Sequence, residues 1–372
     1  MSPDFVDIPF FSFKKVPEEL KNEWFEGLKK TIDAGIFIKG PNVEKFEESW
    51  AKKINVPHVL GVSNGQDGLI LALRALDIGA GAYVAVPAHT FIAVHNAVLT
   101  VGAIPYSLDV DENGLIDLDL LENSNQKIKA IIVVHMHGQM VEMQRLMNWA
   151  AMKNILVIED CSQAHLANQG GINAGAWGDV GVFSLYPTKN LGALGDAGVV
   201  VTKDASTHKA LQLLSNYGSS QHNKYQHFSY GINNRLDEIQ AMILNINLKY
   251  LDSWNLRRRE IAAMYITYLN INKLNFLCSN VNKSVWHHFC VLIKNRSSVR
   301  NSLETAGIHT EIHYPNVAAI EVENFLNISA KRYPKSEQIA QKVLSLPMSP
   351  WHSNEEILLV ASKVNELLAQ QN

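Results

Sequence analysis

The feature that most constrains the fold is a run of four apolar residues, 155–158, closed by two acids, Glu159 and Asp160. Uninterrupted apolar runs of this length are typical of strands buried on both faces, as in a parallel sheet. Ligands in open α/β sheets bind beyond the carboxyl ends of the strands. The two acids are therefore expected at a binding edge.

The same kind of run recurs along the first two thirds of the chain, alternating with helical periodicity. The apolar runs predict strands at 59–62, 83–86, 104–108, 130–135, 155–159, 180–185 and 199–202. The helical patterns cover 67–76, 91–101, 142–153, 205–216 and 236–256. This alternation predicts an α/β protein with a mostly parallel sheet covered on both faces.

The pattern changes after residue 256. One strand is predicted at 286–293, followed by a helix at 299–306, an extended piece through His313 and two more helical stretches near the end. A chain of 372 residues is long for one ordinary core. We therefore expect a large domain over 1–256 and a smaller α+β domain over 257–372.

Composition narrows the functional classes. The chain is 47% hydrophobic and 19% charged, with a net charge of −3, so it has no electrostatic footprint for nucleic acid. Its three cysteines form no CxxC pair or disulfide framework and suit a reducing cytosol. No signal-like segment opens the chain and no apolar run has the length of a membrane span. The expectation is a cytoplasmic enzyme.

Lys189 lies in a glycine-rich turn after an apolar run, in the segment SLYPTKNLGALGDAG (184–198). An amine held there can form a Schiff base with a carbonyl compound, which is how pyridoxal phosphate is anchored. For a lysine considered in isolation, an ordinary surface-loop position is the favoured explanation, because lysine is rarely fully buried.

Asp160 gives that lysine a chemical partner. A carboxylate at a strand end can pair with a protonated pyridine nitrogen, and Gln163, three residues later, can donate to the ring hydroxyl. The alternative is that Asp160 only caps the following helix.

The segment VLGVSNGQDGLILALRAL (59–76) is a strand, a turn and a helix. A glycine-containing turn at a helix N-terminus suits a phosphate. The glycines do not spell G-x-G-x-x-G and no G-x-x-x-x-G-K-[ST] occurs, so the classical dinucleotide and P-loop signatures are missing.

Seven segments carry a family resemblance: GVSNGQDGLILALRAL, VPAHTFIAV, VVHMHGQ, VIEDCSQAH, FSLYPTKNLGALGDAG, YGINNRLDEIQAMIL and IHYP. In order and spacing they resemble the DegT/DnrJ/EryC1/StrS sugar aminotransferases. The resemblance implies pyridoxal-phosphate fold type I, similar to aspartate aminotransferase. It also implies pyridoxal 5'-phosphate as the cofactor, with pyridoxamine phosphate in the cycle.

The resemblance also implies residue roles. Lys189 matches the Schiff-base lysine, Asp160 the pyridinium partner and Gln163 the ring-hydroxyl donor. Asn64, Gly65 and Gln66 match the phosphate-binding turn, and Ser184 matches a hydroxyl that also contacts the phosphate. Phe91 matches an aromatic residue stacked on the cofactor ring, and Asn233 matches an asparagine that reaches the phosphate from the partner subunit. The substrate contacts match Tyr186, His313 and Tyr314.

The same resemblance implies a homodimer with shared active sites. Its nearest pattern is that of 3-keto nucleotide-sugar enzymes, so the expected reaction converts dTDP-3-keto-6-deoxyhexose to dTDP-3-amino-3,6-dideoxyhexose with glutamate as donor, a sugar of the kind found in lipopolysaccharide or O-antigen. A 4-keto substrate, a sugar 3-dehydrase and a non-enzymatic regulatory relative are the alternatives. Lys189 argues against the dehydrase, which has histidine at that position.

Two further groups of residues could bind a metal or an anion. His135 and His137 alternate along a predicted strand and so share a face, as metal ligands would. No third ligand is evident in the sequence, so no metal is expected. His137 also stands where the family frequently has tyrosine or phenylalanine. The basic cluster 257–259 is expected to be a solvated helix end rather than a pyrophosphate site.

Overall fold

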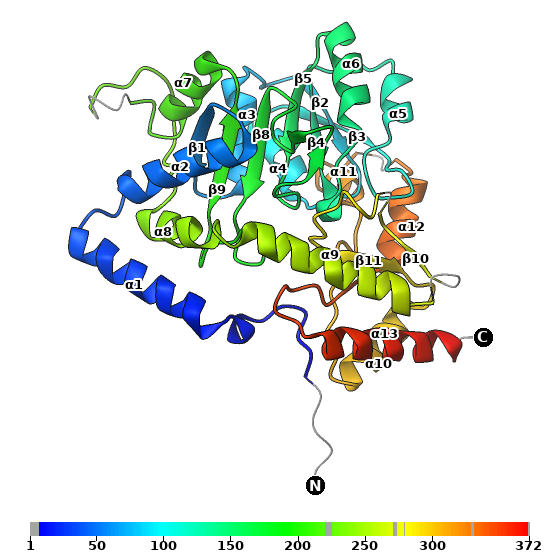
Figure 1. Cartoon of the computed structure of the whole chain (residues 1–372). Helices are drawn as coiled ribbons and strands as arrows, with labels where there is room; N and C mark the ends of the chain where they lie inside the picture. The colour runs from blue at the N-terminus through cyan, green and yellow to red at the C-terminus, as the bar shows by residue number, and fades with distance from the viewer. Residues whose placement is uncertain (1–6, 220–224, 271–273, 279, 329–330, 371–372) are drawn as a thin grey trace.

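The computed structural model describes residues 7–219, 225–270, 274–278, 280–328 and 331–370 (Figure 1). The first element is a short 3-10 turn, η1 (Phe13–Lys15). Two helices follow it, α1 (Glu18–Ala34) and α2 (Pro41–Ile54). Proline at the first position of α2 suits a helix start, because its missing N–H would have no partner there.

A seven-stranded sheet forms the centre of the described residues, in the order β1-β9-β8-β5-β4-β2-β3. The strands from β8 to β3 run parallel, while β9 is antiparallel to both β1 and β8. The strands are β1 (His58–Val62), β2 (Tyr83–Pro87), β3 (Ile104–Leu108), β4 (Ala130–Val134), β5 (Leu156–Asp160), β8 (Val180–Ser184) and β9 (Gly198–Thr202). The expected α/β class and mostly parallel sheet are confirmed.

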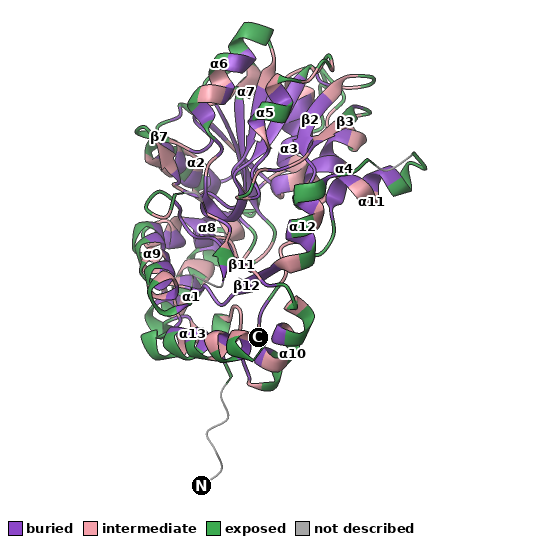
Figure 2. Ribbon diagram, turned by 90° about the vertical axis from the view of Figure 1, so that its right-hand side faces the viewer, coloured by how far each residue is buried: buried purple, intermediate pink, exposed green. Residues whose placement is uncertain are grey.

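Helices cover the sheet, and its central strands are almost wholly buried, whereas the edge strand β3 is mostly half-buried (Figure 2). All five residues of β4 and of β9 are buried, which explains their uninterrupted apolar sequences. The helices that follow the strands are α3 (Gly65–Ala75), α4 (Ala93–Thr100), α5 (Leu118–Glu122), α6 (Met143–Lys153) and α7 (Ala205–Leu214). A 3-10 turn, η2 (Met136–Gly138), follows β4, and β6 (Asn168–Gln169) pairs with β7 (Ile172–Asn173).

The C-terminal part holds a three-stranded antiparallel sheet of β10 (Asn275–Phe276), β11 (Phe289–Leu292) and β12 (Val343–Leu346). Its core gathers large apolar side chains, among them Tyr265, Trp286 and Phe289. The helices here are α10 (Arg296–Thr305), α11 (Ala318–Phe325), α12 (Pro334–Lys342) and α13 (Asn354–Ala369).

The helix predicted at 236–256 is two helices, α8 (Glu238–Asn247) and α9 (Leu251–Tyr268). The expected division between residues 256 and 257 stays a prediction, and α9 runs across it. No helix among the described residues combines the length and apolar character needed to span a bilayer.

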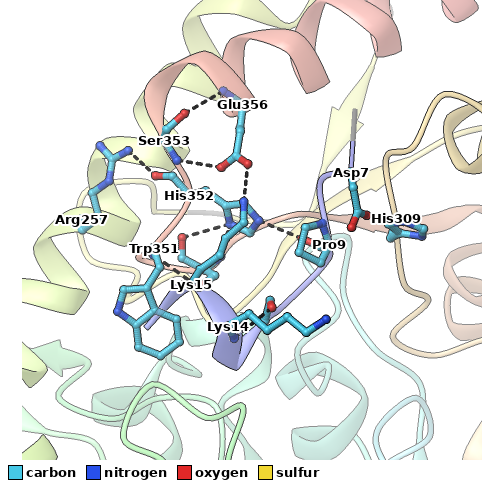
Figure 3. A network of polar contacts seen from close by, with 12 residues as sticks. Asp7, Pro9, Lys14, Lys15, Arg257, His309, Trp351, His352, Ser353 and Glu356 are labelled. Atoms are coloured by element: carbon cyan, nitrogen blue, oxygen red, sulfur yellow. Dashed lines mark hydrogen bonds and ion pairs between the residues drawn. The ribbon is translucent and has the colours of Figure 1, made fainter. Parts of the chain in front are cut away.

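The N-terminal segment is fastened to the C-terminal part, as Figure 3 shows. His352 Nε2 donates to the carbonyl of Pro9 at 2.8 Å, and Lys15 forms an ion pair with Glu356. Ser353 and Glu356 also form a capping box at the start of α13. The first described residues are therefore fastened to α13 and to the segment just before it.

Candidate active site

Two neighbouring parallel strands bring the predicted catalytic residues to one edge of the sheet. Asp160 is the last residue of β5 and pairs in register with Val182 of β8. Ser184 ends β8, and Lys189 lies in the turn that follows. Because parallel strands end at the same edge, residues far apart in the sequence meet there.

Lys189 is half-buried in a tight turn, with its N–H donating to the carbonyl of Tyr186 at 2.9 Å. The turn needs glycine at 192, because a Cβ there would lie 2.4 Å from the carbonyl oxygen of Pro187. Desolvation lowers the pKa of the Lys189 amine to about 8, and the nearby Asp160 carboxylate opposes that shift. The turn thus presents an amine that loses its proton more readily than an ordinary lysine.

The two acids that close β5 have different surroundings. Glu159 is fully buried and accepts hydrogen bonds from the N–H groups of Gly175, Trp177 and Gly178, and it pairs with His135 at 3.0 Å. Asp160 lies close enough to Lys189 to influence its pKa. Successive residues of a strand point to opposite faces, which explains why only one acid faces the lysine.

Gln163 joins the large sheet to the C-terminal part. Its Oε1 accepts from the N–H of His137 at 2.7 Å, and its Nε2 donates to the Tyr314 hydroxyl at 3.1 Å. Burial first of all, and then the charge of Asp160, raise the pKa of the Tyr314 phenol above its ordinary value. Tyr314 is therefore a neutral phenol beside Asp160 and Gln163.

The turn before α3 has the form expected of an anion site. Asn64 is the N-cap of α3, and its side chain is engaged with Asp67, accepting from the Asp67 N–H and donating to its carboxylate, both at 2.9 Å. Among the described residues, the N–H groups of Gly65 and Gln66 have no hydrogen-bond partner. An anion would be met by these backbone groups rather than by the Asn64 side chain.

Gly65 and Ser184 lie against each other. A Cβ on Gly65 would lie 2.8 Å from Ser184 Cβ and 3.2 Å from its Cα, so only glycine fits without moving the end of β8. Ser162, which the sequence did not single out, accepts from the Ser184 N–H at 3.2 Å. Its only sequence signal is its place between Asp160 and Gln163.

Three predicted site residues are exposed in the single chain. Phe91 is 56% exposed, with its ring centroid 5.6 Å from that of Tyr314, and Tyr186 is 50% exposed. Asn233 is also exposed, whereas its neighbour Asn234 is buried and accepts from the N–H and hydroxyl of Ser63, each at 2.8 Å. Asn234 was not predicted, and it fixes the strand end that leads into the Gly65 turn.

His313 stacks on His288, with ring centroids 3.8 Å apart. Its Nδ1 lies 2.9 Å from the hydroxyl of Ser345, and desolvation lowers its pKa to about 3. His313 is thus a neutral imidazole next to Tyr314.

Two expectations from the sequence are wrong. His135 and His137 do not share a strand face, because β4 ends at Val134 and the chain turns into η2; His135 pairs with Glu159, and His137 contacts His288. The cluster at 257–259 is not simply a solvated helix end. Arg258 is buried inside α9 and donates to the carbonyls of Trp286, His287 and Met348.

The residues present fit pyridoxal phosphate. The free N–H groups of the Gly65 turn suit a phosphate, the amine of Lys189 suits an aldehyde, and the Asp160 carboxylate suits a protonated ring nitrogen. All three groups lie at the carboxyl edge of the sheet.

Comparison with known proteins gives a consistent picture. The model of the DegT/DnrJ/EryC1/StrS aminotransferase family matches residues 18–365. The dTDP-3-amino-3,6-dideoxy-alpha-D-galactopyranose transaminase of Aneurinibacillus thermoaerophilus is 40% identical over 361 residues, covering 96% of this chain and 99% of that protein.

Solved structures are similar over the whole chain. S. venezuelae DesV, in complex with a ketimine intermediate, has a TM-score of 0.93 at 37% identity, covering 98% of this chain and 99% of that one. The ntda protein of Bacillus subtilis, with bound cofactor PMP, has a TM-score of 0.91 at 26% identity, covering 99% of this chain and 87% of that one.

Proposed function

This chain belongs to the DegT/DnrJ/EryC1/StrS aminotransferase family, and we propose that it converts dTDP-3-keto-6-deoxyhexose to dTDP-3-amino-3,6-dideoxyhexose with glutamate as amino donor. The family is pyridoxal-phosphate-dependent and the chain is a nucleotide-sugar aminotransferase. The observation that carries the proposal is the meeting of Lys189, Asp160 and Gln163 beside the Gly65 turn.

Each of these residues has a task in holding the cofactor. When bound, pyridoxal phosphate supplies an electron sink for the carbanion formed as a proton leaves the substrate. Lys189 would hold its aldehyde carbon, Asp160 its ring nitrogen and Gln163 its ring hydroxyl. The N–H groups of Gly65 and Gln66 would hold the phosphate together with the hydroxyl of Ser184, while Asn64 caps the helix behind them. Phe91 would stack on the ring.

Lys189 also has the properties of a proton carrier. Its pKa of about 8 keeps part of the amine neutral near physiological pH, so it can accept a proton at Nζ and return it. Asp160 limits how far the pKa of Lys189 falls, because its negative charge favours the protonated amine.

The sugar would lie over the outer side of the same edge. Tyr186 is half exposed there, and His313 and Tyr314 come from the C-terminal part. The Tyr314 hydroxyl accepts from Gln163, so its own O–H proton would be available to donate to a sugar oxygen. His313, a neutral imidazole, would offer its second ring nitrogen.

We infer that a second copy of the chain completes the active site. Phe91 and Tyr186 are large, exposed side chains beside catalytic residues, and such side chains are typical of surfaces that a partner covers. Asn233 is exposed and free to reach a phosphate in the partner subunit. The three free cysteines suit the cytoplasm, where we place the enzyme.

The direct test is a panel of dTDP- and UDP-linked 3-keto and 4-keto sugars, each with glutamate, with amino products identified by mass. We expect turnover to be highest with the dTDP-3-keto-6-deoxyhexose. The Lys189→Ala variant is the inactive control. Preference for a 4-keto sugar or for a UDP carrier would overturn the substrate assignment and leave the family assignment intact.

A further inference from the structure

A buried cluster of two histidines and one cysteine lies beside the active site and has no part in the proposed reaction. His137 comes from η2 after β4, while His288 directly precedes β11 and Cys290 lies within it. Their exposed fractions are 2%, 5% and 1%. One ligand atom from each residue lies within 4.8 Å of the other two.

The spacing of these atoms is that of ligands sharing one ion. His137 Nδ1 lies 3.4 Å from His288 Nδ1 and 3.5 Å from Cys290 Sγ. Zinc–nitrogen bonds of about 2.0–2.1 Å and zinc–sulfur bonds of about 2.3 Å, at tetrahedral angles, place nitrogens roughly 3.3 Å apart and nitrogen and sulfur roughly 3.6 Å apart. Two of the three ligand-to-ligand distances therefore match a zinc site, and the third, between His288 and Cys290, is below 4.8 Å.

The orientation of the His137 ring decides which of its nitrogens would bind an ion. His137 Nδ1 faces both His288 and Cys290, whereas its Nε2 is buried without a hydrogen-bond partner among the described residues. The ligand atom of His137 would therefore be Nδ1.

We propose that His137, His288 and Cys290 bind a Zn²⁺ ion. On binding, the Cys290 thiol releases one proton to solvent and the thiolate and two neutral imidazoles coordinate the ion. Ser345 Oγ, 3.3 Å from Cys290 Sγ, is near enough to take the fourth position or to hold a water there. Thiolate and imidazole ligands favour zinc over magnesium or calcium.

A second group, His135, Glu159 and Cys161, has similar proximity but a different character. The Glu159 carboxylate already accepts from three backbone N–H groups and pairs with His135. Because its oxygens are satisfied, this group needs no ion. It serves as the internal comparison for the proposed site.

The consequence is a metal link between two parts of the fold. His137 follows a strand of the large sheet, whereas Cys290 lies in β11 of the small antiparallel sheet and His288 directly precedes that strand. His137 also donates its N–H to Gln163. An ion bound here would therefore stabilise the contact between the two sheets and hold the loop that supports Gln163.

The test uses the cofactor-loaded enzyme and Co²⁺, whose ligand-field absorption in tetrahedral sites with sulfur is intense and lies to the red of the cofactor. We expect one Co²⁺ per chain, displaced by Zn²⁺, and a rise in Tm of roughly 5 °C with saturating Zn²⁺. Cys290→Ser should weaken binding by about 100-fold or more. His137→Asn, which tolerates the positive φ at this position, should do the same.

Cys278→Ser and Cys161→Ala are the matched cysteine controls, and both should retain the red absorption. The inference is overturned if stoichiometric Co²⁺ produces no such absorption, if Cys290→Ser and His137→Asn leave it unchanged, or if Cys161→Ala abolishes it. Because the readouts are absorption and Tm, they do not depend on the identity of the sugar substrate.

Discussion

Gln163 Nε2 donates to the hydroxyl of Tyr314 at 3.1 Å, across 151 residues of sequence. Gln163 follows β5 of the large sheet, and Tyr314 lies in the C-terminal part next to His313. This single hydrogen bond connects a predicted cofactor residue with a predicted sugar residue. If the two residues have the proposed roles, holding the ring hydroxyl and holding the sugar would be coupled through this side-chain pair.

Replacing Tyr314 with phenylalanine tests that coupling. The variant keeps the ring beside Phe91 but leaves the Gln163 amide without its acceptor, so the amide is held less firmly. We expect kcat to fall by about 5-fold with the cofactor still bound, since one neutral hydrogen bond contributes about 1 kcal/mol. Tyr268→Phe, on an exposed part of α9, is the control and should turn over normally. Equal rates for the two variants would contradict the coupling.

The pH dependence of cofactor binding reports on Lys189. Only the neutral amine attacks an aldehyde, so the rate at which the apoprotein turns yellow with pyridoxal phosphate should rise about tenfold per pH unit below pH 8 and level off above it. Asp160 favours the protonated amine, so Asp160→Asn should move the inflection to lower pH. An inflection near the ordinary lysine value of 10.5 would show that the amine is not desolvated.

The close approach of Gly65 to Ser184 predicts a loss of cofactor affinity on adding one methyl group. In Gly65→Ala the new Cβ would lie 2.8 Å from Ser184 Cβ, and the turn must move away from the phosphate. We expect the Kd of pyridoxal phosphate, measured by fluorescence quenching, to rise by about 10-fold or more, the equivalent of about 1.4 kcal/mol. Gly79→Ala, whose new Cβ would make only an ordinary contact at 3.6 Å, should bind normally.

Much of the fold and of the candidate site depends on short sequence patterns, so it can be predicted from the sequence. Each strand of the large sheet is a short apolar run, and Asp160, Gln163 and Lys189 each follow one. Their place at one edge then follows from the parallel order of β5 and β8. The roles assigned to them in cofactor binding stay predictions.

What the sequence does not predict depends on contacts between distant segments. Cys290 contacts His137 although the two residues are 153 positions apart, so no short sequence motif indicates that Cys290 belongs to the proposed zinc site. In the sequence, Arg258 is one of three consecutive arginines that are typical of a surface. In the structure it is buried and donates to the carbonyls of Trp286 and Met348, which come from distant segments. The break between α8 and α9 has no glycine or proline, and Leu248 and Tyr250 keep nearly helical backbone angles, so helical periodicity continues through it.

Glu159 is predicted to stabilise the fold without acting on substrate. Its buried carboxylate accepts from the N–H groups of Gly175, Trp177 and Gly178, so removing it leaves three backbone donors and the Nε2 atom of His135 without a partner. Glu159→Ala should lower the free energy of unfolding by about 3–5 kcal/mol in a denaturant titration. Glu26→Ala, at an exposed position of α1, should lower it by less than about 0.5 kcal/mol. A small effect of Glu159→Ala would mean that the surrounding loop does not depend on it.

The shared active site can be tested by mixing two defective variants. Lys189→Ala should lower turnover by roughly 10²–10⁴-fold through loss of the proton carrier. Asn233→Ala should weaken activity at limiting cofactor by about 10–100-fold, as expected for one hydrogen bond to a charged group. If Asn233 serves the partner's site, refolding the two variants together gives mixed dimers in which one site has both residues. About one quarter of all sites then work.

The double variant, with both substitutions on one chain, decides between the two arrangements. When the double variant is refolded in excess with wild-type chain, most wild-type chains pair with a chain that lacks Asn233. Activity per wild-type chain should then fall as the mixed dimers form, because the lysine is present but the partner's asparagine is not. If Asn233 instead acts within its own subunit, the wild-type chain stays fully active in the mixed dimer, and the first mixture recovers no activity.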